Sequence, residues 1–176
     1  MAATASAIAM WLLPLWKNCD NGKTHLAIGL GLEAVRIGYS VYFITLSDLA
    51  DQIPKDRADS RWLEKLRVLS HPRLLIIDEV GYVPLDPVVS YFVFSLVCRR
   101  YEKGPMIWTS NKGFAEWASV FAGDEVLTAA ILDRLLHHGT VINIRGKSYR
   151  LRDKLQAGTV AAPITPSQEK TEEDRQ

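Results

Sequence analysis

The sequence predicts a three-layer α/β domain, in which a parallel sheet of five strands carries helices on both faces. Short apolar runs rich in β-branched residues alternate along the chain with segments of helical periodicity, as in α/β folds. The run at residues 74–77 is apolar without interruption, which is typical of a central parallel strand covered on both sides. The 176 residues are 48% hydrophobic and 23% charged, ordinary values for one folded domain.

Capping residues and apolar periodicity locate the helices. The predicted helices occupy residues 25–37, 47–53, 60–69, 89–97 and 125–138. Gly38 ends the first, because glycine readily takes the left-handed conformation that closes a helix. Ser47 is expected to cap the second, and Asp59 or Ser60 the third. From Val89 onward, apolar residues recur at i, i+3, i+4, i+7 and i+8, the pattern of an amphipathic helix.

The remaining apolar runs are predicted strands. They occupy residues 40–45, 74–77, 105–111 and 140–146, with a weaker candidate at 11–16. The weaker candidate contains Pro14, which lacks a backbone donor. Because proline belongs at the edge of a sheet, this segment is a poor candidate for a central strand.

The two ends of the chain depart from this pattern. We expect residues 1–21 to be an atypical apolar segment, 22–155 the folded core, and 156–176 a disordered tail rich in Ala, Pro, Thr and Glu. Residues 1–16 carry no charge, but they are shorter than the ~20 residues that span a bilayer and lack the positive start of a secretory signal. With two cysteines and a net charge of +1, the chain is expected to be cytoplasmic, with no membrane partner.

A phosphate-binding motif is predicted where the first helix begins. Gly22, Lys23 and Thr24 stand directly before it. The free N–H groups of a helix N-terminus attract anions, a lysine there reaches the β- and γ-phosphates, and a hydroxyl ligates Mg²⁺. The tripeptide alone is a weak signal, since about one chain in ten of this length contains it by chance.

Two polar strand ends strengthen this interpretation. Asp78 and Glu79 follow the apolar run 74–77; Asp78 is expected to hold Mg²⁺ through water, and Glu79 to polarise an attacking water. Asn111 ends the next apolar strand and is expected to present its amide near the γ-phosphate, provided that the two strands are neighbours. The alternative interpretations are an acidic helix cap beyond a buried strand and an ordinary strand-ending turn.

Longer phrases of the sequence are more specific than any single motif. The segments GKTHLAIGLGLEAVRIGYSVYF, LLIIDEVGYVPLD, TSN and AAILDRLLHHGTVINIRGKSYRL resemble the IstB family of AAA+ ATPases, insertion-sequence transposition helpers related to the helicase loader DnaC. The similarity covers residues 22–155. It implies a P-loop NTPase core of AAA+ strand order with the last strand at one edge. It also implies ATP-dependent assembly on DNA in partnership with a transposase.

The resemblance also assigns roles to individual residues. The phosphate loop, the acidic pair and the first sensor of the family are matched by Gly22, Lys23, Thr24, Asp78, Glu79 and Asn111. Arg134 resembles the arginine that an AAA+ subunit projects into its neighbour's site, which implies a homo-oligomer. The alternative is a helix arginine paired with Asp133 or Asp153. Arg150 resembles a second sensor, a further nucleotide-binding residue.

The phosphate loop departs from the family pattern. The full motif is G-x-x-x-x-G-K-[ST], but Lys17 stands at its first glycine, and Asp20 stands where the family usually has another. A carboxylate at Asp20 would repel the phosphates by about 3 kcal/mol at ~5 Å and an effective dielectric near 20. We therefore expect a weakened loop. One hypothesis is that residues 1–21 come from a wrong reading frame or a misplaced start, which would also account for the family's missing helical region before the core.

Other residue pairs are expected to be structural. Gly29 and Gly31 lie within a helix and permit close packing, rather than forming a dinucleotide fingerprint. Asp133 and His137 are four residues apart on a helix, but no further ligand lies at a useful spacing. A metal site other than that for Mg²⁺ is therefore not expected.

Three functions follow from these observations. The first is an ATP-hydrolysing helper of a transposase, the second a DnaC-like helicase loader, and the third a degenerate, non-hydrolysing fragment that acts only as an interaction module. The phrases VGYVPLD and ILDRLLHH favour the first over the second, whereas Lys17 and Asp20 favour the third. Residues 134–154 include six bases and one acid, which suits the phosphates of DNA or ATP, or a solvated face.

Overall fold

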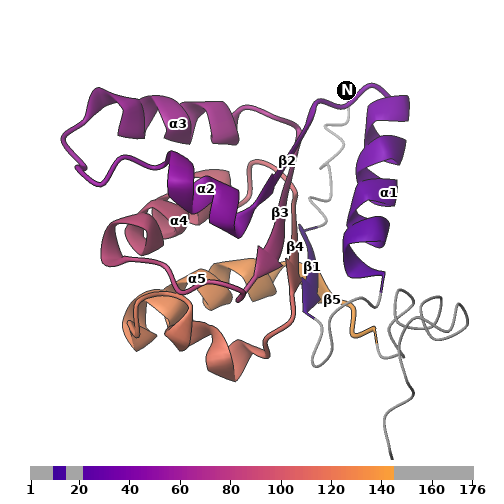
Figure 1. Cartoon of the computed structure of the whole chain (residues 1–176). Coiled ribbons are helices and arrows are strands. Elements are labelled where there is room, and N and C mark those ends of the chain that lie inside the picture. The colour runs from indigo at the N-terminus through magenta and orange to yellow at the C-terminus, as the bar shows by residue number, and fades with distance from the viewer. Residues whose placement is uncertain (1–9, 15–21, 145–176) are drawn as a thin grey trace, which may run out of the picture.

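Parallel strands form one sheet through the centre of the molecule (Figure 1). The structure is a computed structural model that describes residues 10–14 and 22–144. Its strands are β1 (Met10–Pro14), β2 (Val41–Thr45), β3 (Leu74–Val80), β4 (Met106–Ser110) and β5 (Gly139–Val141). Their order is β2-β3-β4-β1-β5, and every neighbouring pair is parallel. The predicted parallel five-stranded sheet with its last strand at one edge is confirmed.

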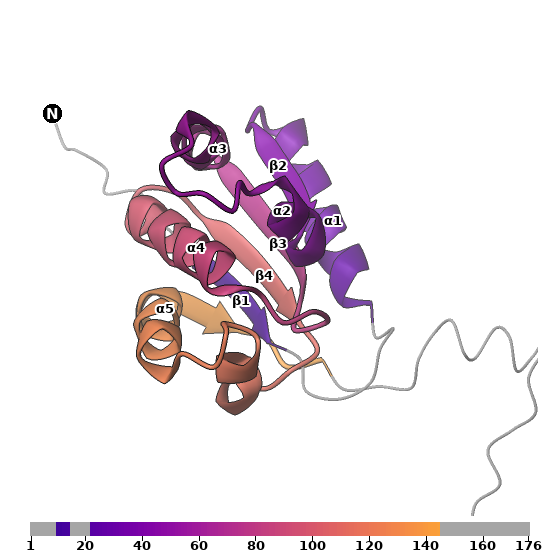
Figure 2. The same ribbon diagram turned by 60° about the vertical axis from the view of Figure 1, so that its left-hand side comes forward.

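Helices cover both faces of this sheet, which confirms the three-layer α/β architecture (Figure 2). One face carries α1 (Lys23–Arg36). The other carries α2 (Leu46–Gln52), α3 (Ser60–Ser70), α4 (Pro87–Arg100), the 3-10 helix η1 (Phe114–Ser119) and α5 (Glu125–His137). No helix in the described part of the chain is long and apolar enough to cross a membrane.

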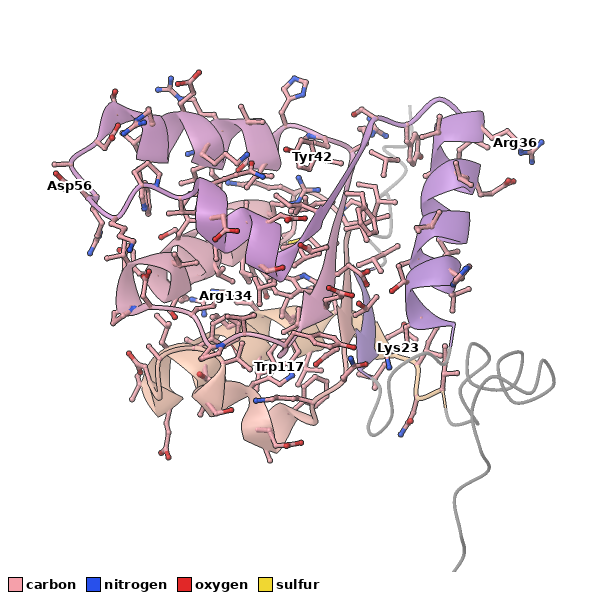
Figure 3. The ribbon with its side chains drawn as sticks, viewed as in Figure 1. Lys23, Arg36, Tyr42, Asp56, Trp117 and Arg134 are labelled. Atoms are coloured by element: carbon pink, nitrogen blue, oxygen red, sulfur yellow. The ribbon has the colours of Figure 1, made fainter. Side chains whose placement is uncertain are left out.

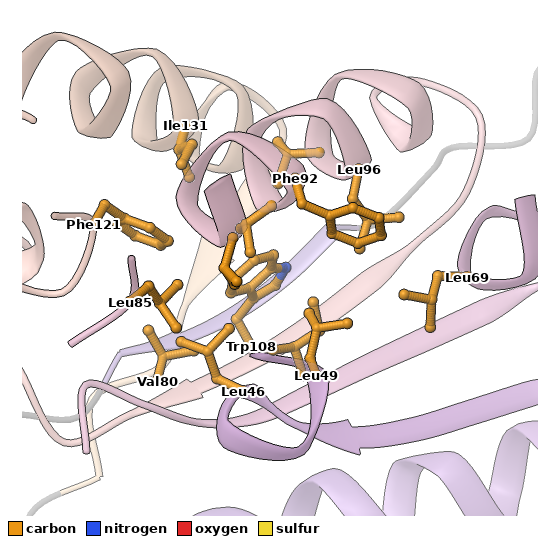
Figure 4. Close-up of a cluster of buried hydrophobic side chains, with 14 of the residues drawn as sticks. Leu46, Leu49, Leu69, Val80, Leu85, Phe92, Leu96, Trp108, Phe121 and Ile131 are labelled. Atoms are coloured by element: carbon orange, nitrogen blue, oxygen red, sulfur yellow. The ribbon is translucent and has the colours of Figure 1, made fainter. Parts of the chain in front are cut away.

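Alternation along β3 divides the core into two parts. Leu75 and Ile77 belong to the larger cluster under α2–α5, while Leu74 and Ile76 pack towards α1. The larger cluster includes Trp108 of β4, which is fully buried among side chains from several elements (Figure 4). Because both sides of β3 are covered, the run at 74–77 has the continuous apolar character noted in the sequence.

Side-chain caps begin four of the helices. The residues whose side chains accept a backbone N–H at these positions are Thr45, Asp59, Asp86 and Asp124. The expectation that Ser47 caps the second helix is wrong. Thr45 is the last residue of β2, and its hydroxyl accepts the N–H of Asp48 at 3.0 Å, so α2 begins with no intervening loop.

The structure also differs from the sequence prediction at β1, β5 and η1. β1 lies between β4 and β5, so the segment around Pro14 forms a central strand after all. Pro14 is tolerated because it is the last residue of β1, where the ladder ends. β5 is shorter than predicted, and η1 is an element that the sequence pattern does not predict. Gly139 opens β5 directly against α5, since a Cβ there would lie 2.2 Å from the carbonyl oxygen of Leu135.

Candidate functional site

Gly22, the residue that precedes α1, leaves the N-terminus of this helix without a side-chain cap of its own. This N-cap glycine adopts a left-handed backbone (φ 80°) and makes no side-chain capping bond. Among residues 22–144, no side chain at the N-cap position occupies the first N–H groups of the helix, and the positive end of the helix dipole lies at the same end. Lys23, the first residue of the helix, is only 8% exposed (Figure 3).

A hydrogen bond joins this helix end to the acidic strand. The Thr24 hydroxyl donates to Asp78 at 2.9 Å from Oδ2 and 3.2 Å from Oδ1. Asp78 lies near the end of β3 and is 2% exposed, so its carboxylate needs partners inside the protein. Residues that are 54 positions apart in the sequence thus meet at one edge of the sheet.

A β-bulge shapes the end of β3. Ile77 pairs with Trp108 and Val80 with Ser110, so two residues of β3, Asp78 and Glu79, stand opposite the single residue Thr109. Glu79 is the extra residue, and its φ of 61° lies in the left-handed region that non-glycine residues seldom adopt. The bulge interrupts the normal alternation, leaving Asp78 buried and Glu79 exposed beside it.

Thr109 ties the two acidic residues together. Its hydroxyl donates to Asp78 Oδ1 and accepts the backbone N–H of Glu79 at 3.0 Å. The sequence pattern places this threonine at a strand end and indicates no role for it. The signal that would reveal the role is the register of β4 against β3, which depends on pairing between distant segments.

Asn111 follows β4 at the same edge of the sheet. Its side chain is partly buried, and its Oδ1 has no hydrogen-bond partner among residues 10–14 and 22–144. The preceding Ser110 fixes the turn: its hydroxyl donates to the carbonyl of Val80 at 2.7 Å and accepts the N–H of Lys112 at 3.0 Å. A buried amide oxygen without a partner marks a place that a ligand or water completes.

Arg134 lies apart from these residues within the chain. It belongs to α5, on the face of the sheet opposite α1 (Figure 3). Its guanidinium donates to the carbonyl of Ala130 at 2.7 Å and lies 5.3 Å from the centre of the Phe94 ring. The described residues contain no ion pair between Arg134 and Asp133. Four other residues named from the sequence lie outside the described part of the chain: Lys17, Asp20, Arg150 and Asp153.

The residues that come together suit a nucleotide with Mg²⁺. Mg²⁺ prefers oxygen ligands, and a hydroxyl and a carboxylate lie 2.9 Å apart at Thr24 and Asp78. Lys23 and the uncapped helix end suit phosphate oxygens. Glu79 is exposed next to this pair, where an attacking water has access.

The strand order and the helix end beside an acidic strand define an α/β domain of the P-loop AAA+ class. The chain matches the family model described as IstB-like ATP binding protein over residues 15–157. It belongs to that family, which confirms the resemblance seen in the sequence.

Two similar proteins come from insertion sequences and are named as ATP-binding. The protein of insertion sequence IS5376 from Geobacillus stearothermophilus is 51% identical over 133 residues, which are 76% of this chain and 53% of that protein. The protein of insertion sequence IS21 from Pseudomonas aeruginosa is 50% identical over 145 residues, 82% of this chain and 54% of that one. The chain thus spans about half the length of these relatives.

Solved structures share the fold at low sequence identity. DnaI aligns with a TM-score of 0.66 and 20% identity, covering 80% of this chain and 75% of DnaI. DnaA from Aquifex aeolicus, bound to AMPPCP, aligns with a TM-score of 0.65 and 19% identity, covering 91% of this chain and 50% of that one. These likenesses show the fold of the chain.

Proposed function

We propose that the chain binds ATP with Mg²⁺ at the end of β3 and hydrolyses it as the helper of a transposase in DNA transposition. The observation that carries this proposal is the hydrogen bond from Thr24 to the buried Asp78. It joins a hydroxyl at a helix N-terminus to a carboxylate at a strand end, the two ligands that P-loop ATPases use for Mg²⁺. We assign the ATPase core to residues 22–155, with β1 as the strand that completes the middle of its sheet.

Each residue of the site has a distinct task in nucleotide binding. Gly22 and the first N–H groups of α1 face the phosphates, and Lys23 neutralises their charge. Thr24 and Asp78 hold Mg²⁺, which when bound neutralises further charge on the β- and γ-phosphates. Arg150 contributes a further contact to the nucleotide by the family resemblance.

Hydrolysis needs a positioned water and a positive group that stabilises the negative charge developing on the γ-phosphate. Glu79 is exposed beside the buried Asp78 and orients the water and takes its proton. Asn111 completes the site with the amide whose Oδ1 lacks a partner among the described residues. Arg134 acts in the site of a neighbouring subunit, because in its own subunit it lies on the other face of the sheet from α1. The active form is therefore a homo-oligomer.

Sequence relatives favour transposition over helicase loading. The relatives with 51% and 50% identity are insertion-sequence proteins, whereas DnaI shares only the fold at 20% identity. We accordingly propose DNA and a transposase as partners. The helicase-loader alternative has no observation of this kind in its favour.

Calorimetric titration of the full chain with ATP, with and without Mg²⁺, tests the proposal. We expect binding that Mg²⁺ strengthens and that Lys23→Ala abolishes, because the β- and γ-phosphates lose their direct cationic partner. Lys55→Ala is the matched control, since Lys55 is exposed in the loop after α2 and should leave affinity unchanged. Failure of the unmodified chain to bind ATP would overturn the proposal and favour the non-hydrolysing interaction module.

A further inference from the structure

Three metal-ligating side chains meet at the edge of the sheet opposite the candidate nucleotide site. Glu102, His137 and His138 each offer one ligand atom, and these three atoms lie within 4.8 Å of one another. Glu102 follows α4, while the two histidines end α5. The C-termini of helices in such a fold lie near the starts of the following strands, so this cluster is far from the ends of β3 and β4.

The donor set is that of a zinc ligand shell. The Nε2 atom of His138 lies 3.5 Å from Glu102 Oε1, and the centres of the two imidazole rings are 4.1 Å apart. Two imidazole nitrogens and a carboxylate suit Zn²⁺, with a fourth position left for water, whereas Mg²⁺ prefers oxygen ligands alone. We propose that Glu102, His137 and His138 form a Zn²⁺-binding site.

Tyr101 orients the imidazoles of this site. Its ring stacks against both histidine rings, at centroid distances of 6.0 Å to His137 and 6.1 Å to His138. Its hydroxyl hydrogen-bonds to Nδ1 of His137, which leaves Nε2 of that ring to bind the ion when Nδ1 carries the proton. A hydrogen bond to the non-ligating nitrogen is the usual way in which proteins fix a histidine ligand.

Buried features hold both ligand-bearing segments in place. Before Glu102, the side chain of the buried Arg100 donates to the carbonyl of Pro105 at 3.0 Å, and its own carbonyl accepts the N–H of Gly104 at 3.1 Å. Beyond His138, Gly139 rests against the end of α5 so closely that no side chain fits there. A site carried on segments that are fixed in this way loses little entropy when it captures an ion.

A bound Zn²⁺ would join the ends of α4 and α5, two neighbouring helices on the same face of the sheet (Figure 2). The ion should bind the folded chain more tightly than the unfolded chain, in which Glu102 is separated from the two adjacent histidines. It should therefore raise the melting temperature of the full chain by mass action. The rise in melting temperature does not depend on ATP or on any partner, so it can be measured in addition to Zn²⁺ binding itself.

Titration of the full chain with ZnCl₂ in excess Mg²⁺ tests the site, because Mg²⁺ saturates oxygen-ligand sites without competing for imidazole. We expect one equivalent of Zn²⁺ to bind and the melting temperature to rise. Tyr101→Phe removes an outer-shell partner and should weaken Zn²⁺ binding by about 10–100-fold. His138→Ala and Glu102→Gln each remove a ligand and should weaken Zn²⁺ binding by more than that. Co²⁺ should give the visible absorption of a four-coordinate ion.

Matched controls separate this site from other zinc ligands of the chain. The chain has four histidines, so His25→Ala and His71→Ala each remove an imidazole outside the cluster and should leave the affinity for Zn²⁺ unchanged. Cys19→Ser and Cys98→Ser exclude thiolate ligation. Far-UV circular dichroism confirms that His138→Ala is folded. The proposal is overturned if the unmodified chain binds no Zn²⁺, or if His138→Ala and Glu102→Gln bind it as tightly as the unmodified chain does.

Discussion

Glu79 combines an exposed carboxylate with a strained backbone. A non-glycine residue in the left-handed region costs of order 1 kcal/mol, and such strain persists where neighbouring structure enforces it. Here the enforcing contact is the hydroxyl of Thr109, which accepts the Glu79 N–H at 3.0 Å while it donates to Asp78. One hydroxyl therefore sets the positions of both acidic residues.

Replacing Thr109 should impair catalysis more than folding. In Thr109→Val the buried Asp78 loses a donor and Glu79 loses its backbone anchor, so we expect ATP turnover to fall by about 10–100-fold, the equivalent of 1.5–3 kcal/mol for a hydrogen bond to a charged group. Thr109→Ser keeps the hydroxyl and should keep most of the activity. Steady-state hydrolysis by the two variants measures the difference; equal activities would show that the hydroxyl does not position the acids.

Replacing Glu79 should stop ATP hydrolysis without removing ATP binding, which depends on Asp78. Glu79→Gln removes the carboxylate that polarises water but leaves the pair of Thr24 and Asp78 intact, so ATP binding should persist while hydrolysis stops. Equilibrium titration with ATP and a phosphate-release assay measure these quantities on the same sample. A variant that also lost binding would contradict this division of roles.

Arg100 connects the end of α3 to the start of β4 through its hydrogen bonds. Its position in the sequence, beside Arg99 and Lys103, favours a role at the dipole of the end of α4, but Arg100 is only 2% exposed. Its guanidinium donates to the carbonyls of Leu69, Ser70, Pro72 and Pro105. Burial lowers the pKa of Arg100 to about 10, which still leaves it charged at neutral pH.

Removing these hydrogen bonds should cost stability. Arg100→Met leaves the carbonyls at the end of α3 without their buried donor, and we expect the free energy of unfolding to fall by about 2–4 kcal/mol. Arg99→Ala is the matched control, because Arg99 is exposed and its loss should change stability by less than about 0.5 kcal/mol. Urea denaturation of both variants gives the comparison; similar midpoints would mean that the hydrogen bonds of Arg100 are dispensable.

The two glycines of α1 should respond oppositely to substitution. A Cβ added at Gly29 would meet no atom within 4 Å, so Gly29→Ala should stabilise the helix by about 0.5–1 kcal/mol. A Cβ at Gly31 would lie 2.9 Å from Ile76 Cδ1, so Gly31→Leu should destabilise the protein by about 1–3 kcal/mol. Thermal unfolding distinguishes the two signs. The expectation of close packing thus holds at Gly31 and is wrong at Gly29.

Capping residues and apolar periodicity predict most helices and strands, whereas contacts between residues far apart in the sequence are not predicted. The N-cap Asp59 and the amphipathic run from Val89 can be predicted because the interacting residues lie within a few positions of one another. The bulge at Glu79 and the burial of Arg100 depend on residues about 30 positions away. The same holds for the candidate site: sequence motifs point to Thr24 and Asp78, which the structure brings together, but no sequence signal points to Thr109.

The position of Arg134 predicts that ATP hydrolysis requires assembly of several subunits. If Arg134 serves a neighbouring subunit, Arg134→Ala should leave ATP binding nearly intact and lower hydrolysis by about 10³–10⁵-fold. Mixing Arg134→Ala subunits with Glu79→Gln subunits should restore part of the activity, since some interfaces then pair an intact arginine with an intact acid. A structural Arg134, resting on Phe94, predicts a lower melting temperature and no rescue.

The central place of β1 has a consequence for how the chain acquires its fold. Among the described strands β1 pairs with β4 and β5 alone, so its first partner, which begins at Met106, leaves the ribosome about 5–20 s after Pro14. β2 and β3 can pair before then, and β4 can join them with its other flank still unpaired. Pulse-labelled hydrogen exchange should find the β2–β3 amides protected before those of β1. Until β1 docks, β5 can pair with the same side of β4, so the docking of β1 decides whether folding ends in the native strand order or in a four-stranded intermediate.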